Sequence, residues 1–353
     1  WLMIKTFNKY LIKRSLYFSF SILIIFGILD SIFTFISELE DISSEYNILS
    51  ICKYVAYSMP HRLIDFIEGA CLLGVMLSLG LSHQEGNLNV LRSAGEAPLK
   101  IILTSSIGAL VLTISLIIFD EISFRNIYLD AQANKNILSN KEKYNKENEI
   151  KWIKYRDSYV GFSEIINDKI YQAKLISIEN KKVTYSIQSD TAEIIDGDIL
   201  FENEALFRNF ENNIKRNQSE SFEIPYQSKI TLNNINNLGI SEINTYRILF
   251  LNSDLEKDIL FKAHLDKIFY KKILLPISVI MLITCFGSLI FTSLRESTVG
   301  GRIIVAVVGA FIYKLFQDLT IGVFISYGML TIIGVIIPIF ILLIVSMIAY
   351  KRI

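Results

Sequence analysis

The sequence has little of what a water-soluble enzyme needs. Only 20% of its 353 residues are charged, whereas 52% are hydrophobic. Soluble domains carry about 25% charged residues, so these values and the mean hydropathy of +0.42 favour a membrane protein. Basic and acidic residues number 35 each, which gives no net charge to attract nucleic acid.

Motifs for nucleotide and metal chemistry are also missing from the sequence. It contains no G-x-x-x-x-G-K-[ST] or G-x-G-x-x-G string, so we expect no cofactor here and expect ATP to be bound by a partner subunit. The three histidines lack the spacing of a catalytic metal site, and the three cysteines lack that of a zinc site or disulfide framework. We therefore expect a protein that is not an enzyme.

Long apolar runs are what the sequence does contain. A helix needs about 20 mostly apolar residues to cross a bilayer. Six runs meet this need, at residues 15–37, 56–82, 99–119, 269–292, 303–323 and 329–350. The first is too long for a secretory signal and lacks a small-residue cleavage site, so we expect it to remain as an uncleaved span.

Charge in the short connections predicts how these spans are oriented. The connections that would share one side carry an excess of basic residues: Lys5, Lys9, Lys13, Arg14, Arg92, Arg295, Arg302, Lys351 and Arg352. The connection at 38–55 on the other side is acidic. By the positive-inside rule, both termini are predicted to be cytoplasmic.

Residues 120–268 interrupt the apolar pattern and have no run that could span a membrane. Four segments alternate polar and apolar residues as β-strands do: Lys151–Phe162, Ile170–Ile178, Lys182–Gln188 and Ala192–Phe201. We expect an external antiparallel β-domain, a sandwich or jelly roll, with helical flanks at 121–148 and 241–268. The fold class is thus a six-span membrane α-helical protein, with transmembrane parts 1–119 and 269–353.

The connection at 83–95 is predicted to form a short amphipathic helix that Gly95 ends. Such a helix suits a membrane subunit that receives force from a separate ATPase. It equally suits a helix that rests on the lipid surface.

Charged residues well inside the apolar runs include Asp30, Glu68, Lys314 and Asp318. Because a charge at the bilayer centre costs about 2.5–3.5 kcal/mol, these side chains should avoid lipid. One interpretation is that Lys314 meets an anionic substrate, with Glu68 or Asp30 tuning it. The other is a structural ion pair, either between helices or between Lys314 and Asp318 one turn apart. His61, Arg62 and Asp65 begin the second span just after Pro60, where the interface can hydrate them, so we expect them only to anchor the span.

An ordered set of short stretches resembles the YjgP/YjgQ family of lipopolysaccharide export permeases, and LptG more closely than LptF. They are Met59-Pro60 through Gly74, Asn87–Gly95, and Phe291 through Pro338, the last including Gly300-Gly301-Arg302 and Tyr327-Gly328. The external segment is similar at Trp152-Ile153-Lys154 and Tyr159-Val160-Gly161-Phe162.

The resemblance implies an inner-membrane permease subunit that extracts lipopolysaccharide. It implies an LptF-like partner in a heterodimer, a dimer of an LptB-like ATPase, and LptC-like and LptA-like periplasmic proteins that receive the lipid. The segment 83–95 would be the coupling helix, with Glu85, Asn87, Leu88, Leu91 and Arg92 as its candidate residues.

The same resemblance implies that the first and fifth spans form lipid gates. The candidate substrate or gate residues are Asp30, Thr34, Glu68, Arg302, Lys314 and Asp318. Arg302 matches a basic family position and suits either phosphate or membrane anchoring. The family's basic residues at the outer end of the first span fall here on Thr34, Glu40 and Asp41, so that phosphate site is not carried over. The family's acidic coupling-helix residue falls on Asn87.

Two other classes of function are weighed against transport. A membrane sensor or receptor with an external β-domain for its ligand would need a sizeable cytoplasmic effector, and the sequence has none. An intramembrane hydrolase would need paired carboxylates or a Ser/His set at one depth, for which Glu68 and Asp30 are candidates by charge alone.

Overall fold

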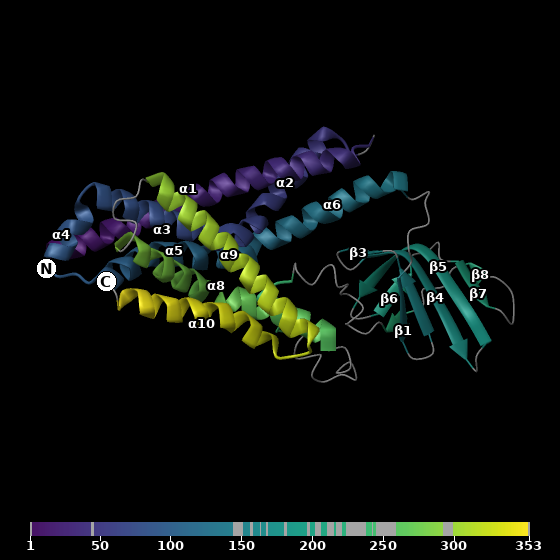
Figure 1. Ribbon diagram of the computed structural model, residues 1–353. Helices are drawn as coiled ribbons and strands as arrows, with labels where there is room; N and C mark the ends of the chain where they lie inside the picture. Colours follow the sequence, from purple (N-terminus) through teal and green to yellow (C-terminus); the bar gives the residue numbers. More distant parts are fainter. Residues whose placement is uncertain are drawn as a thin grey trace. The chain divides into compact units, whose positions relative to one another are not determined.

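The computed structural model describes residues 2–43, 46–143, 151–155, 158–162, 164–166, 169–179, 182–195, 198–201, 206–209, 215–216, 221–223, 238–241, 243–244, 259–291 and 299–351. The chain forms two compact units (Figure 1). One joins Trp1–Lys135 with Asn236–Ile353, and the other is Asn136–Ile235.

The first unit is a helical bundle. Its α-helices are α1 Leu2–Glu38, α2 Ile48–Arg62, α3 Ile67–Gln84, α4 Asn87–Ser93, α5 Pro98–Phe119, α6 Arg125–Lys143 (whose last turns enter the other unit), α8 Ile259–Phe291, α9 Val299–Ser326 and α10 Thr331–Tyr350. Six helical segments of the described chain are long and apolar enough to cross a membrane, as the sequence predicts. They are Thr6–Asp41, Ile48–Gln84, Pro98–Gln132, Lys262–Ser288, Ile303–Ser326 and Thr331–Tyr350.

The second span forms the centre of the bundle. It joins α2, the 3₁₀ segment η2 (Leu63–Phe66) and α3 into one path. The irregular segment follows Pro60, whose missing N–H interrupts the helical hydrogen bonds. In its most apolar stretch 72% of residues are buried, against 22% in the first span and 28% in the fifth and sixth. The peripheral spans therefore present most of their apolar surface outward.

Two glycines let α1 lie directly against its neighbours. A Cβ on Gly74 of α3 would collide with the backbone of Ser19, and a Cβ on Gly108 of α5 would collide with Ile12 and Leu16. Beside this contact, the Ser15 hydroxyl donates to the Ser105 carbonyl at 2.7 Å. Such small-residue contacts allow close packing where lipid replaces the hydrophobic driving force of water.

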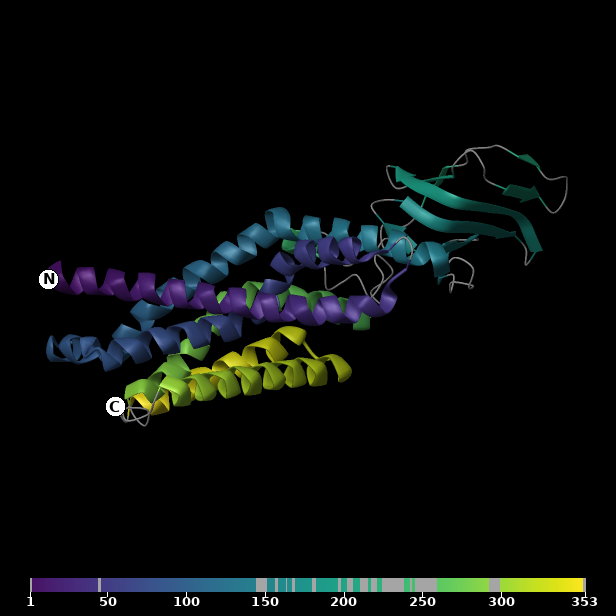
Figure 2. The same cartoon turned by 90° about the horizontal axis from the view of Figure 1, so that it is seen from above.

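The first residues of α1 and the last of α10 lie at the same end of the bundle as α4 (Figures 1 and 2). At the opposite end, the Glu38 carboxylate accepts from the Tyr46 hydroxyl at 2.9 Å and from Lys135 Nζ at 2.6 Å. Tyr46 is fully buried. Burial and the Glu38 hydrogen bond both raise the pKa of Tyr46, so its hydroxyl remains a donor. The contact joins the end of α1 and the segment just before α2 to the middle of α6.

The second unit contains a nine-stranded antiparallel sheet. Its strands are β1 Lys151–Tyr155, β2 Ser158–Phe162, β3 Glu164–Ile166, β4 Lys169–Glu179, β5 Lys182–Ile195, β6 Asp198–Phe201, β7 Leu206–Asn209, β8 Lys215–Arg216 and β9 Ser221–Glu223. The main order is β1-β2-β4-β5-β6-β9, with β3 on β4 and β7 between β5 and β8. This confirms an inserted antiparallel β-domain; the jelly roll in particular stays a prediction.

Several strand boundaries predicted from the sequence are wrong. The segment Lys151–Phe162 contains two strands, β1 and β2, that pair with each other, and Ala192–Phe201 contains the end of β5 and all of β6. The break between Gln188 and Ala192 does not exist, because β5 continues to Ile195 and pairs Ser189 with Ala173 of β4. The Ser189 hydroxyl donates to the Thr191 carbonyl at 2.6 Å, so polar residues that read as a turn are accommodated in the strand. The flank predicted to be helical at 121–148 contains a π-helical turn, Asp120–Phe124, and then α6. Most of 241–258 lies outside the described residues.

We predict that Gly74→Ala lowers the apparent melting temperature of the detergent-purified chain, because the added methyl group meets the Ser19 backbone rather than a movable side chain. Overpacking of this kind costs about 1–3 kcal/mol. Gly322→Ala is the matched control, since a Cβ there meets nothing within 4 Å. Equal melting temperatures for the two variants would contradict the close approach of α1 and α3.

Candidate functional site

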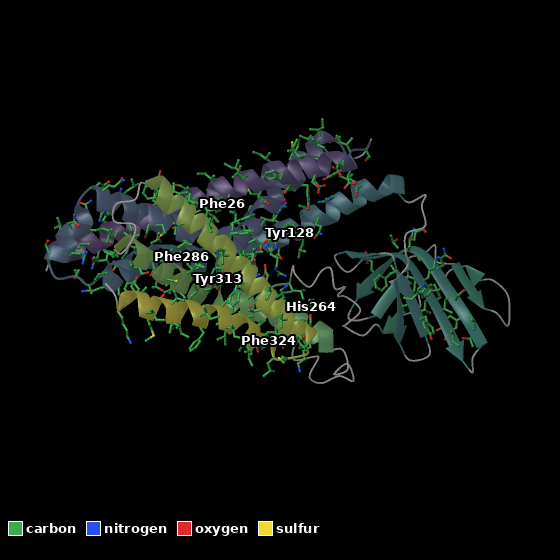
Figure 3. The ribbon with its side chains drawn as sticks, viewed as in Figure 1. Phe26, Tyr128, His264, Phe286, Tyr313 and Phe324 are labelled. Atoms are coloured by element: carbon green, nitrogen blue, oxygen red, sulfur yellow. The ribbon has the colours of Figure 1, made fainter. Side chains whose placement is uncertain are left out.

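A polar pocket of about 430 Å³ lies within the helical bundle. Residues from α2, α3, α6, α8 and α9 line it, among them Tyr128, labelled in Figure 3. Five basic side chains face it, namely Arg62, Lys267, Lys271, Lys272 and Lys314, together with His61 and the two carboxylates Asp65 and Glu68. The pocket thus brings together charged groups from helices that are far apart in the sequence.

Arg62 connects two residues that the sequence analysis proposed separately. Its Nη2 lies 2.8 Å from Asp30 Oδ1, and its Nη1 donates to the Thr34 hydroxyl. The sequence suggested only membrane anchoring for Arg62. The structure instead uses it to pair the carboxylate of α1 with the second span, which compensates a charge that lipid would not solvate.

His61 has a similar structural role next to Arg62. Its Nδ1 lies 2.5 Å from Asp120 Oδ1, and Lys272 Nζ lies 3.7 Å from the other oxygen of Asp120. The ring stacks on Tyr128 with centroids 4.7 Å apart. These contacts link α2, α6 and α8 around the π-helical turn that contains Asp120.

Glu68 is buried in a hydrogen-bond network that the sequence analysis did not anticipate. It accepts from the Ser278 hydroxyl of α8, which also lies 2.6 Å from the Tyr313 hydroxyl of α9. Gln317 Nε2 donates to the Tyr313 hydroxyl at 3.3 Å. Serine and tyrosine are ordinary in apolar runs, so only the three-dimensional contact identifies these two as partners of Glu68.

Lys314 and Asp318, one turn apart on α9, do not form an ion pair with each other. Asp318 Oδ1 instead lies 3.1 Å from Lys271 Nζ on α8. An interhelical ion pair therefore exists, but it uses a different lysine. Within the described part of the chain, Lys314 has no carboxylate within 4 Å.

The predicted amphipathic helix is α4. Gly86 precedes it with φ +76° and Gly95 follows it with φ +85°, both in the left-handed region that glycine adopts without strain. Glu96 N donates to the Leu91 carbonyl at 3.1 Å and Gly95 N to the Arg92 carbonyl at 3.0 Å. These bonds form a Schellman cap, as predicted from Gly95.

The coupling-helix candidates divide between the two faces of α4. Leu88 and Leu91 are buried in the bundle core, so neither is available to contact a partner directly. The exposed face comprises Asn89, Val90, Arg92 and Ser93. The Arg92 guanidinium carbon lies 5.8 Å from the ring centroid of Phe291. Val90, 52% exposed, is the large apolar residue on this face, and the sequence analysis did not name it.

Three candidate residues from the sequence analysis remain: Glu85, Asn87 and Arg302. Asn87 Nδ2 donates to Glu85 Oε2 at 2.8 Å, just where α4 begins. Arg302 lies on α9, and its side chain is outside the described residues. Of all the candidates, Glu68 and Lys314 line the pocket, Asp30, Thr34 and Asp318 contact residues that line it, and Arg92 lies on the exposed face of α4.

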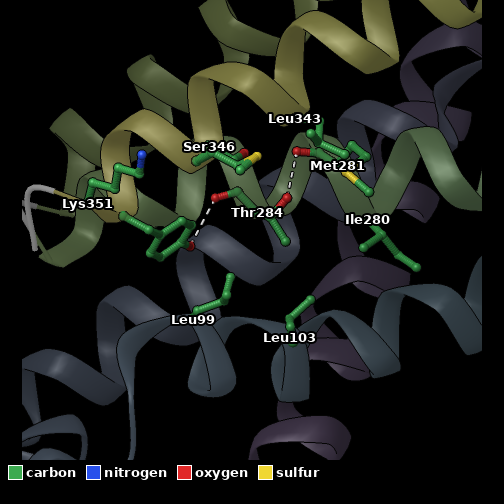
Figure 4. A pocket seen from close by; sticks show the side chains of 10 residues that line it. Leu99, Leu103, Ile280, Met281, Thr284, Leu343, Ser346 and Lys351 are labelled. Carbon is green, nitrogen blue, oxygen red and sulfur yellow. Dashed lines mark hydrogen bonds between the residues drawn. The ribbon is translucent and has the colours of Figure 1, made fainter.

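A second hollow of about 420 Å³ lies between α5, α8 and α10 (Figure 4). Two of its polar side chains bond within the protein: the Tyr350 hydroxyl donates to the Thr284 carbonyl at 3.0 Å, and the Thr284 hydroxyl to the Met281 carbonyl at 2.9 Å. Lys351 is the one charged residue among those lining it. With its other surface apolar, this groove is a poorer candidate for recognising a charged ligand.

We expect Ser278→Ala to lower the apparent melting temperature, because it leaves the buried Glu68 carboxylate without its donor. Such a loss costs about 1–3 kcal/mol. The control is Ser106→Ala, since the buried Ser106 hydroxyl donates only within its own helix, to the Leu103 carbonyl at 2.8 Å. The network has no stabilising role if both variants melt alike.

Comparison with known proteins agrees with the resemblance in the sequence. The family described as lipopolysaccharide export system permease LptF/LptG matches residues 9–352. The lipopolysaccharide export system permease protein LptG of Haemophilus influenzae is 23% identical over 374 aligned residues, which cover 99% of this chain and 100% of that protein. With its six membrane-spanning helices, the protein is a multi-pass inner-membrane transport subunit. The chain belongs to the LptF/LptG family of lipopolysaccharide export system permeases.

Proposed function

We propose that the chain is the LptG-like half of an ABC transporter that extracts lipopolysaccharide from the inner membrane and passes it to a periplasmic bridge. It binds no ATP itself; a dimer of an LptB-like ATPase supplies the energy. The observation that carries the proposal is Lys314, a cation on a membrane-spanning helix that faces a polar pocket and has no carboxylate within 4 Å among the described residues.

The chemistry of the pocket supports an anionic lipid as the ligand. Arg62, Lys271 and Lys272 each have a carboxylate partner within 4 Å, so their charges are largely compensated. Lys314 is compensated only by more distant carboxylates, including Glu68 and Asp65. Because burying an incompletely paired charge is costly, a phosphate or carboxylate on the lipid would stabilise this arrangement.

The outer surfaces of α1 and α9 support pairing with a second membrane permease. Both helices pack on α3, and at Gly69 a Cβ would lie 3.8 Å from both Phe26 of α1 and Ala310 of α9. Large exposed apolar side chains extend along both helices: Ile25, Ile28, Leu29, Ile32, Phe33, Ile36, Ile304, Val307, Val308, Phe311, Ile312 and Leu315. We infer that α1 and α9 face the lipid pathway and an LptF-like permease in a heterodimer.

We infer that the exposed face of α4 binds the ATPase. This helix lies at the same end of the bundle as the start of α1 and the end of α10 (Figure 1). The basic connections at that end favour a cytoplasmic location by the positive-inside rule. The β-domain would then be periplasmic, where it would meet LptC-like and LptA-like proteins. A lipid moves only if the two states of the transporter bind it with different affinity.

Lys314→Gln should weaken lipid binding while leaving assembly intact. Loss of a charge-assisted contact predicts about a tenfold rise in the lipopolysaccharide concentration that half-maximally stimulates ATP hydrolysis by the purified assembly. Lys262→Gln is the control, because Lys262 is an exposed lysine on α8 that does not line the pocket. An unchanged lipid dependence in the Lys314 variant would remove the main support for the proposal.

Val90→Asp should release the ATPase without unfolding the chain, because Val90 is exposed whereas Leu88 and Leu91 are core residues. A charge in the centre of an interface costs several kcal/mol, so about a hundredfold weaker retention is expected on gel filtration. Val183→Asp, at a 40% exposed valine of the β-domain, controls for the substitution itself. Full retention by the Val90 variant would show that α4 is not the binding surface.

A further inference from the structure

Arg14 of α1 forms an ion pair with Glu85, which follows α3 and lies two positions before α4. Its Nη1 lies 2.6 Å from Glu85 Oε2 and its Nη2 lies 2.7 Å from Glu85 Oε1. Two parallel N–H···O bonds fix both distance and orientation, which a single bond to a lysine does not. The two residues are 71 positions apart in the sequence, so the contact is tertiary.

Both members of this pair are themselves held in place. Arg14 Nη1 also lies 2.6 Å from the Tyr10 hydroxyl and 3.3 Å from the Ser82 hydroxyl, and the Arg14 side chain is only 13% exposed. Glu85 accepts from Asn87, the first residue of α4, at 2.8 Å. The hydrogen bond from Arg14 keeps the pKa of Glu85 below its usual range, so the carboxylate stays ionised at neutral pH.

Side-chain contacts connect α4 to α1 independently of the peptide backbone. The peptide backbone joins α4 to α3 through Gly86, whose lack of a side chain makes this connection compliant. The route Asn87, Glu85, Arg14 runs from the start of α4 to α1 through directional bonds. Further along α1, Ser15 packs against α5 and Ser19 against α3, whereas many apolar residues beyond Phe26 are exposed.

We propose that Arg14, Glu85 and Asn87 form a latch that makes α1 follow α4 when the ATPase moves it. This rests on the proposed function. Arg14 and Glu85 are positioning residues: they touch neither ATP nor lipid, and they convert displacement of α4 into displacement of the helix whose outer surface faces the lipid pathway. Loss of Arg14, which lies on α1 and outside the ATPase-binding surface, leaves ATP hydrolysis intact and lowers the lipid moved per ATP.

The first experiment measures whether the latch orders α4 in the purified chain. Hydrogen–deuterium exchange over residues 84–93 should be faster in Arg14→Gln than in wild type. Lys13→Gln removes the neighbouring, exposed positive charge on α1 and should not change it. Equal exchange in both variants would overturn the latch, whatever the transport activity of the chain.

The second experiment measures coupling in proteoliposomes that contain the complete assembly and lipopolysaccharide. Arg14→Gln and Glu85→Gln should each lower lipid released per ATP about fivefold, the lower end of typical coupling effects. Arg14→Lys, which cannot make the paired contact, should behave likewise. The double variant Arg14→Glu with Glu85→Arg should recover to within about twofold of wild type.

The outcomes separate this inference from the proposed function. A wild-type chain that binds no ATPase and releases no lipid contradicts the proposed function, and the exchange experiment still decides whether the latch exists. An active wild type with an unchanged lipid-to-ATP ratio in all single variants overturns the latch alone. So does a charge exchange that restores nothing, because then the two residues do not act as a pair.

Discussion

The free-energy cost of a charge in the bilayer determines how this bundle is assembled. No water compensates a lone carboxylate or ammonium group there, so each must meet another helix. Asp30 meets Arg62, Asp120 meets His61 and Lys272, and Asp318 meets Lys271. Because these contacts link α1, the second span, α6, α8 and α9, they position the walls of the pocket, and Lys314 is left facing that pocket with no carboxylate close by among the described residues.

The same arrangement connects α4 mechanically to the rest of the bundle. Leu88 and Leu91 anchor α4 in the core, while its outer face is exposed. Close contacts through Gly74 and Gly108 hold one half of α1 against α3 and α5, and the Arg14 and Glu85 pair connects that half to α4. A displacement of α4 can therefore be transmitted through this ion pair to α1, whose remaining apolar surface is exposed in the single chain.

Much of the fold follows from the sequence because hydropathy and turn chemistry are local. The six spans, the inserted antiparallel sheet, and the end of α4 at Gly95 were predictable. Side-chain partners were not, since they depend on helix rotation. The sequence offered Asp318 either Lys314, one turn away, or an unnamed partner on another helix, and the partner in the structure is Lys271 on α8. The spacing of Leu88 and Leu91 fits a helix face that binds a partner and equally a face that packs on the core. Only the packing shows that these residues face the core. Ser278 carried no signal at all.

The central claim is that the polar pocket receives the anionic lipid. A photoreactive phenylalanine analogue at Tyr128, which lines that pocket, tests it directly. The account predicts that the assembly forms a lipopolysaccharide adduct at this position, that Lys314→Gln abolishes it, and that the same probe at Leu103 in the apolar groove forms none. An adduct at Leu103 and none at Tyr128 would contradict the account.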